Sequence, residues 1–196
     1  MRKEIDSLGE VEIDDNKYYG IHTLRALENF DIKNMKRVNS ELIKSITLIK
    51  AAAAITNNKI KKLSDKKKNA ILDAVEKIMS GFYTHKVLFP LPAIQGGAGT
   101  STNMNVNEVI ANLGLEYMAK NKGEYKFLDP IEDVNLSQST NDVYPTAVKI
   151  TIIRLLKELV EEVKNLQEEL QKKEDEFATI DRKSTRLNSS HAFLSR

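Results

Sequence analysis

A segment near the end of the chain carries apolar residues at alternating four- and three-residue steps. This apolar seam runs from Ile152 to Ile180 through Leu156, Leu159, Val163, Leu166, Leu170, Lys173 and Phe177, and Lys173 is its one polar interruption. Such spacing is typical of a helix that packs lengthwise against other helices. Because Pro145 suits the first turn of a helix, we expect one helix over 145–180, about 54 Å long at 1.5 Å per residue.

Shorter helical patterns precede the seam. Apolar residues fall on one stripe over 40–57, and Ser64 has the position of an N-cap for a second amphipathic helix that ends before Pro90. A third helix is expected over 104–120, with these residues facing inward: Val106, Val109, Ile110, Leu113 and Tyr117. Only 8–13 alternates like a short strand. The sequence therefore predicts a mainly all-α fold.

Composition excludes several classes of function. The chain has no cysteine, which removes disulfides, thiol nucleophiles and Cys-based metal sites. His22 and His85 lack a second ligand at helical spacing, so we expect no metal. The net charge of +2 gives no basic face for nucleic acid, and the longest apolar stretch, 46–55, is too short to cross a membrane. We expect a cytoplasmic protein without signal peptide or cofactor.

Two polar loops stand where helices begin. The first loop (95–103) contains Gly96, Gly97 and Gly99, followed by hydroxyl and amide side chains, and the second loop (134–142) is also rich in Ser, Thr and Asn. Free N–H groups and the positive end of the helix dipole favour an anion at such places. The pattern suits a small carboxylate held without a metal. It is equally the pattern of ordinary N-caps and turns.

Other motifs carry less information. The first loop lacks the Gly-Lys-Ser/Thr of a phosphate-binding P-loop and the third spaced glycine of a dinucleotide fingerprint. Lysines at 61–62 and 66–68 are expected on a solvated face. Glu108 and Glu116 could be buried acids, although most glutamates on helices are exposed.

Longer blocks resemble one enzyme family. The segments 97–112 and 134–147, with Tyr19-Gly20-Ile21-His22-Thr23 near the start, resemble conserved blocks of the aspartase/fumarase superfamily. The resemblance covers 4–180. Within the superfamily, Thr100-Ser101 and Ser139-Thr140-Asn141 favour the aspartate ammonia-lyases over the class II fumarases, which tend to have Thr-Gln and Ser-Ser-Asn there.

The resemblance implies a helical three-domain subunit in a homotetramer whose active sites combine residues of three chains. It implies that Thr100, Ser139, Thr140 and Asn141, with Asn103 nearby, hold a dicarboxylate or amino-acid substrate. The reaction would be a β-elimination that converts L-aspartate to fumarate and ammonia through an aci-carboxylate intermediate. A class II fumarate hydratase is the alternative. A non-catalytic helical scaffold or coiled-coil protein is an alternative of another class, but it leaves the polar loops unexplained.

The same resemblance predicts the chain's organisation. We expect an N-terminal lyase domain over 1–140 and the first long helix of a truncated helical bundle over 141–180. Residues 181–191 and 195–196 resemble a translated sequencing adapter, so we expect 181–196 to be a non-native tail. No Gly-Ser-Ser loop with the family's base serine and no Gly-Arg-Thr-His segment occurs in the sequence. We therefore expect no catalytic residue in this chain, no activity of the chain alone, and association through the bare seam.

Overall fold

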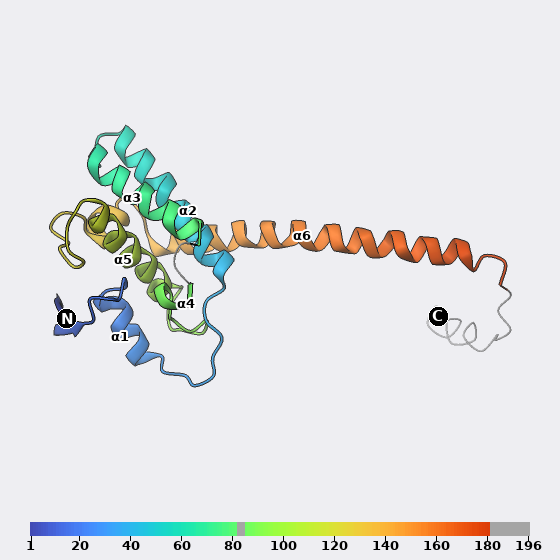
Figure 1. The fold of residues 1–196 in the computed structure, drawn as a ribbon, viewed down its shortest axis with the longest axis horizontal. Helices are drawn as coiled ribbons and strands as arrows, with labels where there is room; N and C mark the ends of the chain where they lie inside the picture. Colours follow the sequence, from blue (N-terminus) through green and yellow to red (C-terminus); the bar gives the residue numbers. More distant parts are fainter. Residues whose placement is uncertain (82–84, 181–196) are drawn as a thin grey trace. The chain divides into compact units, whose positions relative to one another are not determined.

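The computed structural model describes residues 1–81 and 85–180 of the 196-residue chain. The elements, in order, are β1 (Arg2–Asp6), β2 (Gly9–Ile13), α1 (Ile21–Asn29), α2 (Ser40–Lys59), α3 (Asp65–Met79), α4 (His85–Leu88), α5 (Thr100–Tyr117), the π-helix η1 (Pro130–Val134) and α6 (Thr140–Glu176) (Figure 1). The predicted mainly helical fold is confirmed. The chain divides into two compact units, Met1–Ile152 and Ile153–Arg196.

Three helices build the core of the first unit. Helix α3 packs against both α2 and α5 (Figure 1). Their contact surfaces consist of fully buried side chains, among them Ile43, Ile46, Ile71, Ile78, Val109, Ile110 and Leu113. Gly114 lets α5 approach α3 closely, because a Cβ there would lie 2.5 Å from Leu128 Cδ2 and 3.2 Å from the carbonyl oxygen of Ala70.

Helix α5 is the central element. It begins at Thr100, four residues before the predicted start, and nearly every side chain from Thr102 to Leu115 is buried. The predicted inward position of Tyr117 is wrong, since this residue is 51% exposed at the end of the helix. Because neighbours surround α5 on most sides, its polar positions are buried as deeply as its apolar ones.

The predicted N-cap of α3 is confirmed: Ser64 Oγ accepts a hydrogen bond from the amide of Lys67. Helix α2 begins at the predicted Ser40 and continues two residues past the predicted end. Its first turn is capped by Asn39, whose Oδ1 accepts from the amide of Glu41 at 2.8 Å. Local capping residues thus fix where these helices begin.

A two-stranded antiparallel hairpin precedes the helices. Strands β1 and β2 pair with Arg2 opposite Ile13 and Asp6 opposite Gly9. The alternating segment 8–13 was expected as a strand, whereas β1 has a charged sequence that gives no such signal. One of its charged residues, Glu4, is only 5% exposed and returns in the site described below.

Helix α6 begins at Thr140, five residues earlier than predicted, so Pro145 lies inside its second turn. Its first turns belong to the core, where Val143 and Ala147 are buried. Within the described part of the second unit, the seam side chains Leu156, Leu159, Val163, Leu166, Leu170 and Phe177 are 49–62% exposed. About half of each of these seam side chains is therefore exposed.

The predicted non-native tail, 181–196, lies outside the described residues, and the predicted division at residue 140 stays a prediction. Among the residues that the structure describes, no helix is both long enough and apolar enough to cross a membrane.

Candidate functional site

The two polar loops meet in the folded chain. Asn103 Nδ2, in the first turn of α5, donates to Thr140 Oγ1 at 3.2 Å, and Thr140 begins α6. The side chain of Asn103 is 1% exposed, whereas Thr100, Ser139 and Asn141 are exposed. The structure thus brings the starts of α5 and α6 together, as a shared carboxylate site requires. The roles of these five residues in binding stay predictions.

The start of α5 leaves backbone donors open. Gly97 and Gly99 have φ of +76° and +84°, a region that favours glycine, and the N-cap Gly99 has no side chain to cap the helix. The next amides, of Thr100 and Ser101, donate no hydrogen bond to any described residue. Two unpaired N–H groups at the positive end of an 18-residue helix can bind an anion.

Gln95 holds the first loop in its path. Its Oε1 accepts from both the amide and the hydroxyl of Thr102 at 3.0 Å, and its Nε2 donates to the carbonyl of Pro92 at 2.8 Å. The glycine-rich turn is therefore fixed at both ends. Sequence reasoning did not single out Gln95, because its partners are backbone groups and a hydroxyl that any of several side chains could reach.

The start of α6 combines a cap with an open carbonyl. Ser139 Oγ accepts from the amide of Asn141 at 3.2 Å, which is the ordinary capping arrangement. Pro145 has no N–H and cannot donate to the carbonyl of Asn141 four residues earlier, as the helix would otherwise require. The carbonyl of Asn141 therefore lacks the helical partner that any other residue at position 145 would supply.

A hollow of about 290 Å³ lies between the first loop and the start of α6. We call it the loop hollow. Its lining includes Gln95, Gly97, Gly99, Asn141, Tyr144 and Pro145. Of the predicted site residues, only Asn141 lines it. Thr100, Ser139, Thr140 and Asn103 lie in the adjoining turns rather than on its wall.

A buried lysine beneath the second loop was missed by the sequence analysis. The side chain of Lys50, from the middle of α2, is 0% exposed. Its Nζ donates to Asn135 Oδ1 at 2.7 Å and to Gln138 Oε1 at 3.0 Å. Burial lowers the pKa of Lys50 to about 7. The sequence shows only a lysine within an apolar stretch. It does not indicate that this lysine hydrogen-bonds residues 85 and 88 positions later in the chain.

Two further asparagines converge on the same amide oxygen. Asn103 Nδ2 and Asn107 Nδ2 donate to Asn135 Oδ1 at 3.1 and 3.3 Å. The Oδ1 atoms of Asn103 and Asn107 are buried and have no hydrogen-bond partner among the described residues. Asn135 therefore joins α2, α5 and the second loop through a single acceptor.

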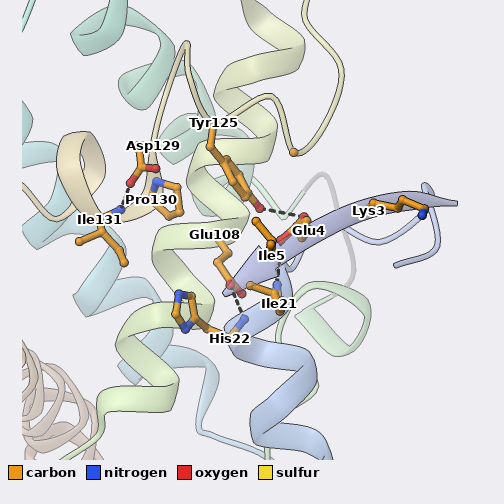
Figure 2. Close-up of a pocket in the computed structure, with 11 residues that line it drawn as sticks. Lys3, Glu4, Ile5, Ile21, His22, Glu108, Tyr125, Asp129, Pro130 and Ile131 are labelled. Carbon is orange, nitrogen blue, oxygen red and sulfur yellow. Dashed lines mark hydrogen bonds between the residues drawn. The ribbon is translucent and has the colours of Figure 1, made fainter. Parts of the chain in front are cut away.

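A second polar cluster surrounds the start of α1. Figure 2 shows Glu4 and Glu108 directed at this helix start, with Tyr125 above Glu4. A cavity of about 270 Å³ adjoins them. The question of Glu108 left open by the sequence is answered, because its side chain is 1% exposed. Burial raises the pKa of Glu108, while hydrogen bonds from Thr23 and Gly20 act in the opposite direction.

The two carboxylates cap α1 rather than offer an acid and a base. Glu108 accepts from the amides of Gly20, His22 and Thr23 at 2.8–3.1 Å, and from the Thr23 hydroxyl at 2.6 Å. Glu4 accepts from the amide of Ile21 at 2.9 Å. All four N–H groups at this helix start are thereby paired. This start is closed, in contrast to the open start of α5.

Comparisons with known proteins agree with this picture. A family model described as Lyase matches residues 9–182. An aspartate ammonia-lyase of Helicobacter pylori (strain J99) is 50% identical over 181 residues, or 92% of this chain, and one of a Bacillus species is 46% identical over 180 residues. The chain spans 38% of the length of these relatives.

Solved structures of related lyases have a similar sequence and fold. The fumarate lyase:delta crystallin of Brucella melitensis is 41% identical with a TM-score of 0.85, over 91% of this chain and 41% of that one. The class II fumarase of Schistosoma mansoni is 36% identical with a TM-score of 0.70, over 77% of this chain and 31% of that one. By its sequence, its helical fold and these similarities, the chain belongs to the lyase family that includes the aspartate ammonia-lyases and class II fumarases.

Proposed function

We propose that this chain is a segment of an aspartate ammonia-lyase subunit, which converts L-aspartate to fumarate and ammonia. The observation that carries the proposal is the meeting of two helix starts, joined by Asn103 and Thr140 and bearing the open amides of Thr100 and Ser101. The 50% identity to an aspartate ammonia-lyase supports the choice of substrate.

In the proposed reaction, a base removes a proton from the carbon next to the β-carboxylate of aspartate. That carboxylate becomes an aci-carboxylate dianion, and the C–N bond then breaks to release ammonia and leave fumarate. Thr100, Ser139, Thr140 and Asn141 would donate to the substrate carboxylates or amine. Donors fixed before the reaction lower the barrier most where negative charge develops. The base comes from a segment outside this sequence, which contains no Gly-Ser-Ser loop.

The intact enzyme is proposed to be a homotetramer. The exposed apolar seam supports this, since about half of each seam side chain remains uncovered and heptad spacing suits helix-to-helix packing. Each active site would then combine residues from several subunits. A cytoplasmic location stays a prediction from the sequence.

The test uses a complete subunit that carries residues 1–180, with fumarate formation from L-aspartate followed by ultraviolet absorbance. Replacing Thr100 or Ser139 by Ala should lower kcat about 100-fold or more, as loss of one oxyanion donor does in other enzymes. Thr56→Val, an exposed hydroxyl deletion on α2, is the matched control. Full activity in both site variants would contradict the roles of Thr100 and Ser139. A wild-type subunit inactive toward both L-aspartate and L-malate would contradict the proposal and leave the scaffold alternative, for which each substitution loses only about 1 kcal/mol of capping energy.

The second candidate is a class II fumarate hydratase, favoured by the similarity to the Schistosoma mansoni fumarase. Both enzymes bind the same four-carbon dicarboxylate skeleton. Parallel assays with L-malate and L-aspartate separate them, because the hydratase forms fumarate from malate alone. The 196-residue chain by itself is expected to be inactive with either substrate, and turnover by the purified chain would contradict that.

A further inference from the structure

Lys50 is a buried charge that neither the packing of the core nor the proposed reaction accounts for. It lies in the middle of α2 with a fully buried side chain. Removing an ammonium group from water is unfavourable, and a methionine of similar length would fill the same space without that penalty. No carboxylate hydrogen-bonds Lys50 among the described residues. Its polar contacts must therefore explain its presence.

Both contacts lie in the second loop, and they belong to a ring of hydrogen bonds. Gln138 accepts from Lys50 and donates through Nε2 to the carbonyls of Val134 and Leu136 at 3.0 and 3.2 Å. Asn135 accepts from Lys50 and donates through Nδ2 to the carbonyl of Gln138 at 3.1 Å. Nζ of Lys50 closes this ring and fixes the backbone immediately before Ser139.

The same ring reaches the first turn of α5. Asn103 Nδ2 lies 3.1 Å from Asn135 Oδ1 and 3.2 Å from Thr140 Oγ1. A displacement of Asn135 would therefore disturb the bond that joins the two helix starts. Lys50 does not line the loop hollow, so it acts on the proposed site only through these neighbours.

We propose that Lys50 is a positioning residue: its buried Nζ, which donates to Asn135 and Gln138, sets the path of the second loop so that Ser139 to Asn141 meet the first loop. The catalytic meaning of this role rests on the proposed function. The positioning itself is a property of this chain and can be measured without turnover.

The experiment is amide hydrogen exchange on the 196-residue chain with Lys50→Met, which keeps the side-chain length and removes the donors. The amides of Gln138 and Val143, bonded to the carbonyls of Asn135 and Ser139, should exchange about ten-fold faster or more, as expected for loss of a charge-assisted hydrogen bond. The amides of Ile110 and Leu113, in α5, should be unchanged. Lys59→Met, the same substitution at an exposed site of α2, is the control.

Two results overturn the proposal. Unchanged exchange in the second loop would mean that Lys50 does not position it, and equal acceleration at Ile110 and Leu113 would mean that Lys50 only supports the core. If Lys50→Met does not fold, Lys50→Gln, which shortens the side chain and keeps one donor group, must give the same selective pattern with smaller acceleration.

The complete subunit separates this proposal from the proposed function. There Lys50→Met should raise KM for aspartate at least about ten-fold through the weakened carboxylate contacts, with partial rescue by Lys50→Gln, which retains a donor. A wild-type subunit without activity toward aspartate would refute the proposed function. The exchange result on the chain would still decide the role of Lys50.

Discussion

Gly99 is the position where a single methyl group should most disturb the proposed site. Its φ of +84° is unfavourable for any residue with a Cβ, and that Cβ would overlap the ring of Tyr144 from α6. The left-handed backbone adds about 1–2 kcal/mol for alanine. Forcing an extra methyl group into a filled space adds about 1–3 kcal/mol. Gly99→Ala should therefore destabilise the first unit by about 2–5 kcal/mol.

Gly81 separates the two contributions. It also has a positive φ, +73°, but a Cβ there would meet no described residue within 4 Å. Gly81→Ala should accordingly show only the backbone penalty of about 1–2 kcal/mol. The measurement is urea unfolding of the chain by far-ultraviolet circular dichroism, at a concentration low enough to limit association.

The double variant Gly99→Ala with Tyr144→Ala completes the cycle. Removing the ring should relieve the overlap and leave the backbone penalty, so the coupling energy between the two positions should be about 1–3 kcal/mol. If Gly99→Ala is no worse than Gly81→Ala, and Tyr144→Ala does not change its effect, Tyr144 does not lie against the first loop and the loop hollow is misplaced.

Three further predictions follow from the buried charges and the seam. Glu108→Gln should lower the free energy of unfolding in urea by about 2–4 kcal/mol, because an amide N–H₂ would face donors of α1. The exposed Glu76→Gln is the control, and equal effects of the two substitutions would refute the capping role of Glu108. Because burial lowers the pKa of Lys50 to about 7, the unfolded chain binds an extra proton above that pH, so stability should rise by about 3 kcal/mol between about pH 7 and 9.5. Lys50→Met should lack this slope, and a slope that persists in it would assign the effect to another group. Leu159→Glu with Leu166→Glu should abolish self-association in sedimentation velocity; a wild-type chain that is monomeric at high concentration would contradict association through the seam.

The parts of the fold that could be predicted are those with local causes. Ser64 caps α3 because its hydroxyl reaches an amide three residues later, and the seam of α6 repeats at a helical period. The starts of α5 and α6 were placed too late for a related reason. Thr100 to Asn103 were counted in the first loop, although α5 begins directly after its N-cap Gly99. Pro145 was expected in the first turn of α6 but lies in its second.

The parts that could not be predicted depend on distant neighbours. The buried face of α5 holds Asn103, Asn107 and Asn112, and Asn112 donates to the carbonyl of Tyr18, 94 residues earlier in the chain. Periodicity distinguishes apolar from polar positions, but it does not predict which polar residues are buried in a helix that neighbours surround on most sides. Of the candidate site, the two loops were identified from the sequence, whereas the supporting residues Lys50 and Gln95 emerged only from their contacts.

The closed start of α1 has a consequence for the order in which the chain acquires structure during synthesis. Helix α1 has nine residues, too few to be stable alone in water. Its principal cap, Glu108, follows Thr23 by 85 residues. At about 5–20 residues per second, a ribosome needs roughly 4–17 s to add them. During that interval Glu4 can cap only the amide of Ile21, and the amides of Gly20, His22 and Thr23 lack their partner, so the full capping of α1 waits for the synthesis of α5.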